Sequence, residues 1–173
     1  MEMTGEMANG WLGTSFIPEQ ADIFLDPLKR GLAKSGRQLS DIDVQVGGSL
    51  EIDEDVERLI EARRPAMAFT LGGMGSAQTN FYNDAFRRAG YEDAAIEVQS
   101  LWVNGDKEAA IRAVPDEMVL KTNLIGTREM VIERVKAYAE AGVTTLRITT
   151  SGKNWRERTE TLAEATDLIH SIR

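Results

Sequence analysis

The 173-residue sequence contains no cysteine, a single histidine and no apolar run near the length of a membrane span. The absence of cysteine excludes disulfides, thiolate zinc sites and cysteine nucleophiles, and it fits a reducing cytoplasm. His170 lies three residues from the end of the chain, where a cation often faces the C terminus of a helix. Histidine-based metal sites and catalytic triads are therefore not expected, and no metal centre is predicted.

The sequence also lacks an excess of positive charge. Lys and Arg total 20 against 28 Asp and Glu, which gives a formal net charge of −8. Because no basic stripe offsets this charge, a general nucleic-acid surface is not expected. A membrane span needs about 20 apolar residues, and the acidic N-terminal segment MEMTGEMANG lacks the positive region of a signal peptide. We predict a cytoplasmic protein that binds neither nucleic acid nor membrane.

The segment 126–151 shows the clearest local pattern, which is helix, stop and strand. Thr127 can cap the helix with its hydroxyl, and apolar residues recur behind it at helical spacing. Gly142 follows the last helical residue, where a left-handed C-cap is easiest for glycine. Residues 143–150 are then rich in β-branched side chains. A helix followed directly by such a strand is half of a βαβ unit, which predicts a parallel sheet.

The order of strand, loop and helix is predicted three times along the chain. The predicted strands are 10–14, 42–52 and 143–150. The last strand leads into a helix at 155–172, for which Asn154 and Glu157 resemble a capping box. The chain therefore reads as one domain, 1–173, of α/β class.

Helices fill most of the remaining sequence. They are predicted at 1–8, 18–33, 80–89, 93–103 and 106–113. A further helix begins at Asp53-Glu54-Asp55, where acidic residues favour the helix dipole. Pro27 and Pro65 are each predicted to kink or break a helix, and 115–123 is predicted to be a linker. Residues 54–123 together are predicted to form a helical insertion within the second strand–helix unit.

Several motifs carry a family resemblance by their order and spacing across most of the chain. They are Gly5-Glu6-Met7-Ala8-Asn9-Gly10-Trp11, Gly72-Gly73-Met74-Gly75-Ser76, Asn80-Phe81-Tyr82, Arg88-Ala89-Gly90-Tyr91, Gly126-Thr127 and Ala139-Glu140-Ala141-Gly142-Val143. Together they resemble the bacterial luciferase-like flavin and deazaflavin oxidoreductases. The resemblance is strongest to the branch that uses the deazaflavin coenzyme F-420.

The resemblance implies a partial TIM-type (β/α)8 barrel. A whole barrel of this kind takes about 250 residues or more. This chain would be its C-terminal portion, with about three parallel strands that correspond to strands six to eight. Three strands cannot close a barrel, so two edges would be unpaired and one apolar face open. We expect a truncated protein whose N-terminal half is missing, or a chain completed by a partner, for which a homo-oligomer is a hypothesis.

The resemblance also implies cofactor-binding residues. Thr14 and Ser15 follow the first strand, and the residue matching Thr14 in relatives lies near the deazaflavin tail, where its hydroxyl would donate to a phosphate oxygen. A turn hydroxyl bonded to local backbone is the alternative for both. Gly152 and Lys153, after the last strand, are a weaker candidate for anion binding, with solvated surface charge as the alternative. Arg147 would need a carboxylate partner if it points into the barrel.

The implied chemistry is hydride transfer between coenzyme F-420 and a small organic substrate, with the protein positioning the cofactor. One alternative is an FMN-dependent monooxygenase. Another is a non-catalytic barrel fragment that acts as an assembly module. No catalytic residue is assigned, because Asp53 and Glu54, the carboxylates nearest the expected site, are explained by helix capping. The substrate is also left unassigned.

Overall fold

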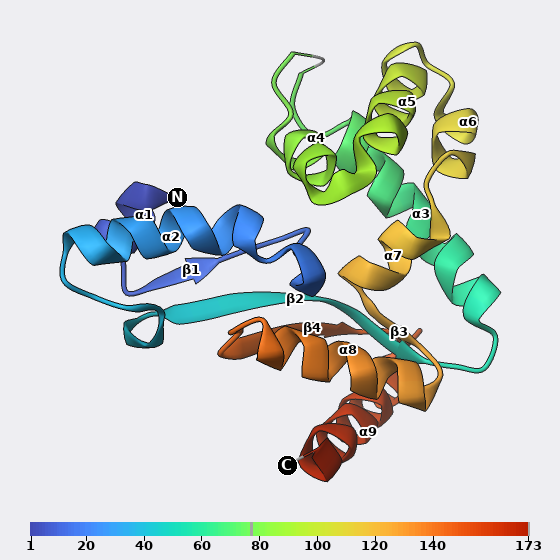
Figure 1. The fold of residues 1–173 in the computed structure, drawn as a ribbon. Helices are drawn as coiled ribbons and strands as arrows, with labels where there is room; N and C mark the ends of the chain where they lie inside the picture. Colours follow the sequence, from blue (N-terminus) through green and yellow to red (C-terminus); the bar gives the residue numbers. More distant parts are fainter. Residues whose placement is uncertain (77, 173) are drawn as a thin grey trace.

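The centre of the computed structural model, which describes residues 1–76 and 78–172, is a four-stranded parallel sheet (Figure 1). β2 (Asp43–Ile52) pairs in parallel with the other strands: β1 (Gly10–Leu12) along its beginning, β3 (Leu124–Gly126) at its end, and β4 (Thr145–Thr150) from its third residue onward. The three predicted strands and their parallel arrangement are confirmed. The short β3 was not predicted.

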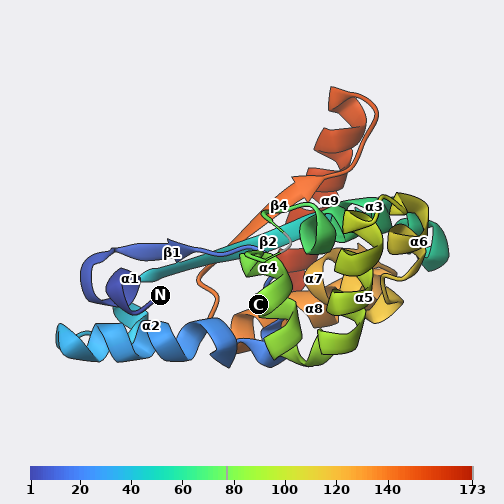
Figure 2. The ribbon, with the colours of Figure 1, turned by 90° about the horizontal axis from the view of Figure 1, so that it is seen from above.

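One face of the sheet is covered by three helices: α2 (Asp22–Lys34), α8 (Arg128–Glu140) and α9 (Trp155–Ile172). Figure 2 shows α2 and α8 along the same side of the strands. Val44, Val46 and Leu50 of β2 point to this side, and each is at most 1% exposed. Because side chains alternate along a strand, these apolar positions select the face that the helices bury.

The N-terminal helix α1 (Glu2–Met7) crosses α2 at a distance that requires glycine on both helices. A Cβ on Gly5 would lie 2.2 Å from the carbonyl oxygen of Leu28, and one on Gly31 would lie 1.9 Å from that of Glu2. The carboxylate of Glu2 also pairs with two basic side chains of α2, at 2.7 and 2.8 Å. The predicted helix at 1–8 is confirmed, and it is held to the sheet layer through α2.

The predicted capping residues are confirmed at the ends of α8 and α9. Thr127 accepts a hydrogen bond from the N–H of Met130 at 3.4 Å, and Gly142 follows α8 with a φ of 88°. Asn154 accepts from the N–H of Glu157 at 3.1 Å. These contacts satisfy backbone groups that helix ends otherwise leave without partners.

A second layer of helices occupies residues 56–122, between β2 and β3. Its members are α3 (Val56–Gly72), α4 (Phe81–Phe86), the π-helical turn Arg87–Tyr91, α5 (Glu92–Val103), α6 (Lys107–Arg112) and α7 (Asp116–Thr122). They group beside the carboxyl end of β2 (Figure 1) around an apolar cluster of their own. Short 3-10 turns at Pro18–Gln20 and Leu39–Asp41 complete the elements. No helix in 1–76 or 78–172 is long and apolar enough to cross a bilayer.

Two expectations about helix boundaries differ from the structure. Of the kink or break predicted at each proline, a break is absent: α2 runs through Pro27 and α3 through Pro65, because packing of an apolar face outweighs the one hydrogen bond that each proline removes. The stretch 115–123, predicted as a linker, forms α7 and leads directly into β3. Met118 and Val119 explain this difference, since both side chains are fully buried.

The other face of the sheet is open and mostly polar, so the expectation of an open apolar face is wrong. Gln45 and Ser49 of β2 and Arg147 and Thr149 of β4 alternate with the buried positions. The apolar residues of both strands already face the helices, which leaves polar side chains on the open face. Leu12 of β1 is the apolar exception and is 60% exposed. Within the described residues, β1 and β4 each pair only with β2, so the predicted free edges are present.

Candidate functional site

A cleft of about 280 Å³, the main cleft, lies over the middle of β2, beside the last residues of β4 and the turn that follows β1. β2 and β4 form its floor, and α3 and the end of α7 form its walls. Its lining residues are Ser15, Gly47, Gly48, Ser49, Arg63, Ala66, Met67, Thr70, Thr122, Asn123 and Thr149. Ligands of parallel α/β folds bind at the carboxyl ends of the strands, and the ends of β1 and β4 border the main cleft, so it is the candidate site.

Two consecutive glycines leave the floor of the main cleft without side chains. A Cβ on Gly47 would lie 1.6 Å from a carbonyl oxygen of β4, and one on Gly48 would lie 2.7 Å from the carbonyl oxygen of Thr122. The backbones of β4 and α7 therefore approach β2 more closely than other residue types permit. The N–H of Ser49 then donates to Oδ1 of Asn123 at 3.2 Å, which fixes the end of α7 against the strand.

Of the two predicted cofactor-binding residues, the structure places Ser15 in the lining of the main cleft and Thr14 outside it. Ser15 is half-buried and has a φ of 55°, a left-handed conformation that is uncommon for serine. Thr14 is exposed in the same turn. The turn thus presents Ser15 to the cleft, and the binding role of each hydroxyl stays a prediction.

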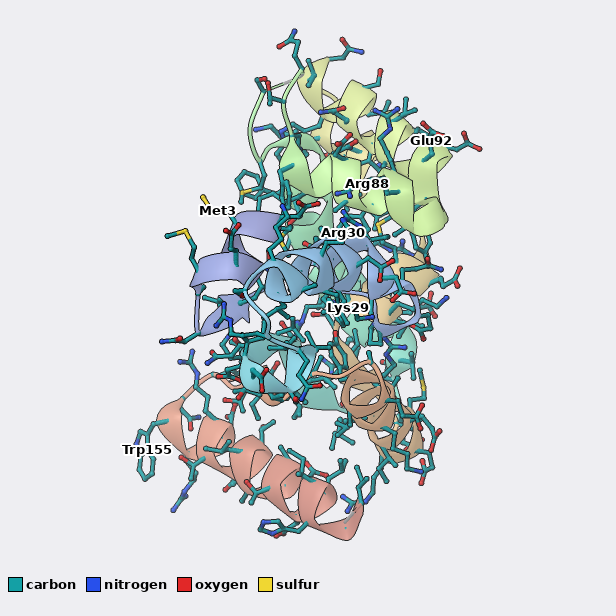
Figure 3. All side chains as sticks on the ribbon, turned by 60° about the vertical axis from the view of Figure 1, so that its left-hand side comes forward. Met3, Lys29, Arg30, Arg88, Glu92 and Trp155 are labelled. Carbon is teal, nitrogen blue, oxygen red and sulfur yellow. The ribbon has the colours of Figure 1, made fainter. Side chains whose placement is uncertain are left out.

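A second cleft of about 390 Å³, the side cleft, lies against the loop between β4 and α9. Its lining residues are Glu51, Arg63, Thr150, Ser151, Gly152, Lys153, Glu157 and Arg158. The loop is closed by its own contacts: the Glu157 carboxylate accepts from the backbone N–H of Lys153 at 2.7 Å, and Nε of Arg158 donates to the Gly152 carbonyl at 3.1 Å. Trp155 points outward from the first turn of α9 (Figure 3) and is 78% exposed. Gly152 and Lys153 therefore share one cleft, and their anion-binding role stays a prediction.

Arg63 of α3 forms part of both clefts. Its Nη2 donates to Oε2 of Glu51 and to Oγ of Ser151, each at 2.8 Å. Its side chain is 19% exposed, and its buried Nε has no hydrogen-bond partner in the described part of the chain. The other oxygen of Glu51 accepts from Arg58 at 2.9 Å. The Arg63 guanidinium is thus fixed in place while part of its five-donor set is unused.

Glu51 is held in its charged form by this network. Burial alone would raise the pKa of Glu51, but hydrogen bonds from Ser151, Arg58 and Arg63 outweigh burial and lower the pKa below its ordinary value. A carboxylate with a lowered pKa is a poor general base at neutral pH. Glu51 therefore serves to orient the two arginines.

The carboxylates at the start of α3 act as caps, as predicted. Asp53 accepts from the N–H of Asp55 at 2.8 Å, and Asp55 accepts from the N–H of Arg58 at 3.1 Å. No group of three or more His, Cys, Asp or Glu residues that could hold a metal ion occurs in 1–76 or 78–172. The main cleft offers hydroxyls, backbone groups and one basic side chain, and the side cleft adds two carboxylates beside its basic residues.

Arg147 lies on the open face of the sheet, on the side opposite Leu146 and Ile148, which pack against the buried cluster. Its Nη2 donates to the carbonyl oxygen of Gly13, just after β1, over 3.5 Å. No carboxylate among the described residues forms an ion pair with it. Its charge therefore faces the space next to the main cleft.

The comparison with known families identifies the family to which this fold belongs. Residues 1–145 match the luciferase-like monooxygenase family. The chain belongs to this family. The matched span contains every residue of the main cleft except Thr149, so the family match covers nearly the whole candidate site.

Curated relatives carry coenzyme F-420 or a pterin substrate in their names. The chain is 30% identical over 149 residues to a protein of Mycobacterium tuberculosis named as a coenzyme F-420-dependent oxidoreductase. The matched residues are 85% of this chain and 43% of that protein. The chain is 27% identical over 145 residues to 5,10-methylenetetrahydromethanopterin reductase of Methanopyrus kandleri, and the match covers 83% of this chain and 40% of the reductase. The chain therefore spans less than half the length of these relatives.

Solved structures show the same fold. The coenzyme F-420-dependent tetrahydromethanopterin reductase from Methanopyrus kandleri superposes with a TM-score of 0.73 at 23% identity, covering 99% of this chain and 48% of that one. A coenzyme F-420-dependent secondary alcohol dehydrogenase, solved with a coenzyme F-420–acetone adduct, superposes with a TM-score of 0.61 at 13% sequence identity. This match covers 97% of this chain and 45% of the dehydrogenase chain. The predicted α/β fold, a partial TIM-type barrel, is confirmed.

Sequence reasoning missed most of the main cleft. Gly47-Gly48 was an available signal, because glycine inside a strand often marks a close backbone approach. Arg63 gave no signal, since a charged residue in an amphipathic helix is ordinary. Its partner Ser151 lies 88 positions away, and only the fold brings the two together.

Proposed function

We propose that this chain is the C-terminal part of a coenzyme F-420-dependent oxidoreductase, and that its main cleft holds part of the deazaflavin cofactor. The observation that carries the proposal is the glycine floor of the main cleft, in the middle of β2 next to β4, within a chain that belongs to the luciferase-like monooxygenase family. The names of its curated relatives favour the deazaflavin over FMN.

The size and lining of the main cleft fit one segment of such a cofactor. Sites for whole cofactors commonly enclose about 300–1,000 Å³, whereas the main cleft has about 280 Å³. Gly47 and Gly48 permit close contact between backbone and ligand. Hydroxyls of Ser15, Thr70 and Thr149 surround this floor. The cleft thus suits the polar tail of the cofactor better than its ring system.

In this proposal the residues of this chain bind the cofactor and orient it. When bound, the deazaflavin supplies hydride transfer at its ring. Ser15, with Thr14 beside it, would donate its hydroxyl to an oxygen of the tail. Arg63 would supply positive charge at the edge of the cleft. The groups that contact the substrate, a small organic molecule, are proposed to come from elsewhere in the whole protein.

We further propose that other β/α units complete the open face of the sheet. A barrel of this class needs about eight strands, and β1 and β4 offer free edges with a polar face between them. The additional strands would come from a longer protein or from another copy of the chain. Either arrangement would close the space that Arg147 faces.

The test is a fluorescence titration of the purified chain with oxidised coenzyme F-420 and, separately, with FMN. We expect saturable binding of coenzyme F-420 and weaker binding of FMN. Ser15→Ala should weaken coenzyme F-420 binding several-fold, since a hydrogen bond contributes about 0.5–1.5 kcal/mol. The matched control Ser100→Ala removes an exposed hydroxyl of α5 outside both clefts.

The titration also separates the alternatives. Tighter binding of FMN would favour a flavin-dependent monooxygenase. If a chain shown to be folded by circular dichroism binds neither cofactor, the proposal is wrong and an assembly role is favoured.

A further inference from the structure

We propose that Arg63 is an anion anchor, whose guanidinium binds a phosphate or carboxylate group where the main and side clefts meet. The identity of the ligand rests on the proposed function, because a deazaflavin cofactor or its substrate would bring the anion. The anchor itself is argued from the contacts, burial and charges of this chain.

The guanidinium of Arg63 combines a fixed position with unused hydrogen-bond donors. Glu51 and Ser151 both accept from Nη2, so they set the orientation of the guanidinium. Nε is buried without a partner among the described residues. Native proteins pair most of their buried donors, and an unpaired one is costly. A bound anion, with a small adjustment of the side chain, would use this spare capacity in the fork geometry that suits phosphate and carboxylate.

The local charge balance of the two clefts also favours an anion. The lining of the two clefts contains the cations Arg63, Lys153 and Arg158 and the carboxylates Glu51 and Glu157, which is three against two. The whole chain, by contrast, carries a formal net charge of −8. Both carboxylates are already engaged: Glu51 by two arginines, and Glu157 by the loop that it closes. The ammonium of Lys153 has no ion pair in the part of the chain that the structure describes. The clefts therefore hold positive charge that nothing within them neutralises.

A purely structural role for Arg63 is the competing explanation. Arg63 ties α3 to β2 and to the loop after β4, and removing it would loosen these contacts. Arg58 provides the matched control. It pairs with the same carboxylate, Glu51, at 2.9 Å, but it lines neither cleft. A structural role predicts similar effects from the two arginines, whereas the anchor predicts an effect on anion binding from Arg63 alone.

The test follows arginine Nε–H signals in ¹H–¹⁵N spectra of the chain during titration with inorganic phosphate, with sodium chloride at matched ionic strength as the control. The Arg63 signal is assigned by its absence in Arg63→Gln. We expect it to shift saturably with phosphate and not with chloride. Arg63→Gln should weaken phosphate binding about 10-fold or more, as expected for a lost charge-assisted hydrogen bond. Arg58→Gln should change it less than about two-fold.

A second titration identifies the source of the anion, using coenzyme F-420 and its phosphate-free deazaflavin core. If Arg63→Gln weakens binding of coenzyme F-420 and leaves the core unchanged, the anchor holds the cofactor phosphate. If Arg63→Gln binds coenzyme F-420 and the deazaflavin core as wild type does but no longer binds phosphate, Arg63 binds an anionic group of the substrate. If neither deazaflavin binds the wild-type chain but phosphate still shifts the Arg63 signal, the proposed function fails and the anchor stands.

Two results would overturn the anchor. One is an Arg63 signal that phosphate leaves unmoved. The other is an Arg63→Gln chain that binds phosphate and coenzyme F-420 as tightly as wild type. If Arg63→Gln does not fold, Arg63→Lys takes its place, because it keeps the charge and loses the planar fork. The anchor then predicts weaker phosphate binding with an unchanged melting temperature, and unchanged phosphate binding would contradict it.

Discussion

At the residue scale, a few side chains determine how the layers meet. Tyr138 of α8 is 1% exposed, and its hydroxyl donates to the carbonyl oxygen of Phe16 over 3.3 Å. This contact joins α8 to the turn that carries Ser15. Arg134 lies over the ring, with its guanidinium carbon 5.7 Å from the ring centre. One buried tyrosine thus connects the helix layer to the candidate site.

Tyr138 gives a pH-dependent prediction. Burial raises the pKa of Tyr138 to about 12, above the value near 10 of an unfolded tyrosine. The folded state therefore holds this proton more tightly. Its stabilising contribution is complete below about pH 10 and is lost as the pH rises through 12. Urea unfolding of wild type and Tyr138→Phe should show that the wild-type free energy of unfolding falls more steeply from pH 9 to 11. Equal slopes would contradict the assignment.

Gly47 gives a prediction that joins packing to binding. A methyl group there would meet a β4 carbonyl oxygen at 1.6 Å, so Gly47→Ala should force β2 and β4 apart. We expect a loss of stability of about 1–3 kcal/mol, as for other overpacked sites, together with weaker coenzyme F-420 binding. Urea unfolding and the fluorescence titration measure the two effects. Gly36→Ala is the control, because a Cβ there meets nothing within 4 Å, although its positive φ carries a strain cost. Unchanged binding in Gly47→Ala would contradict the placement of the ligand.

At the element scale, the crossing of α1 and α2 leaves no room for a side chain at the contact. Gly31 lies inside α2, where glycine normally costs about 0.5–1 kcal/mol relative to alanine. The adjoining helix reverses this preference, because a Cβ on Gly31 would meet the Glu2 carbonyl oxygen at 1.9 Å. Close backbone packing, rather than helix propensity, therefore fixes the residue here.

Gly31→Ala is accordingly expected to destabilise the chain by about 1–3 kcal/mol, where propensity alone predicts a gain. The measurement is the free energy of unfolding in urea. Gly31→Ala in a chain that lacks residues 1–8 is the control, since the clash is then removed. A stabilised full-length variant would show that α1 does not hold this position in solution.

Elements with strong local signals were predictable from the sequence, and those set by distant contacts were not. The caps at Thr127 and Asn154 and the strands at 42–52 and 143–150 rest on local patterns, and all were predicted. β3 has three residues, which are too few for a periodic pattern. α7 is stabilised by burial against other helices, and the sequence alone does not show where those helices lie relative to one another. The main cleft was missed for the same reason, because its lining comes from segments that lie far apart in the sequence.

At the scale of the whole molecule, two apolar clusters meet at β3, whose Leu124 belongs to one cluster and whose Ile125 belongs to the other. One cluster lies between the sheet and α2, α8 and α9, and the other lies within the helices α3 to α7. The main cleft opens where these layers meet, with its floor from the sheet and a wall from α3. The open polar face continues from this cleft along β2 and β4. The site and the uncovered surface are therefore one continuous region.

The free edges of the sheet lead to a prediction for hydrogen exchange. Amides of β2 bond to strands on both sides, whereas β4 pairs on one side only. Amides of β4 that point away from β2 should exchange much faster than those of β2. Residue-resolved exchange measured by NMR at low protein concentration provides the test. Equal protection of the outer β4 amides would mean that another chain or segment already covers this edge.

The most direct test of the account is an amide chemical-shift map of the chain with and without coenzyme F-420. The account predicts saturable shifts centred on Ser15, Gly47, Gly48, Ser49 and Asn123, with amides of α5 and the C-terminal half of α9 unchanged. Shifts confined to α5, or the absence of saturable shifts in a folded chain, would contradict the claim that the main cleft holds the cofactor.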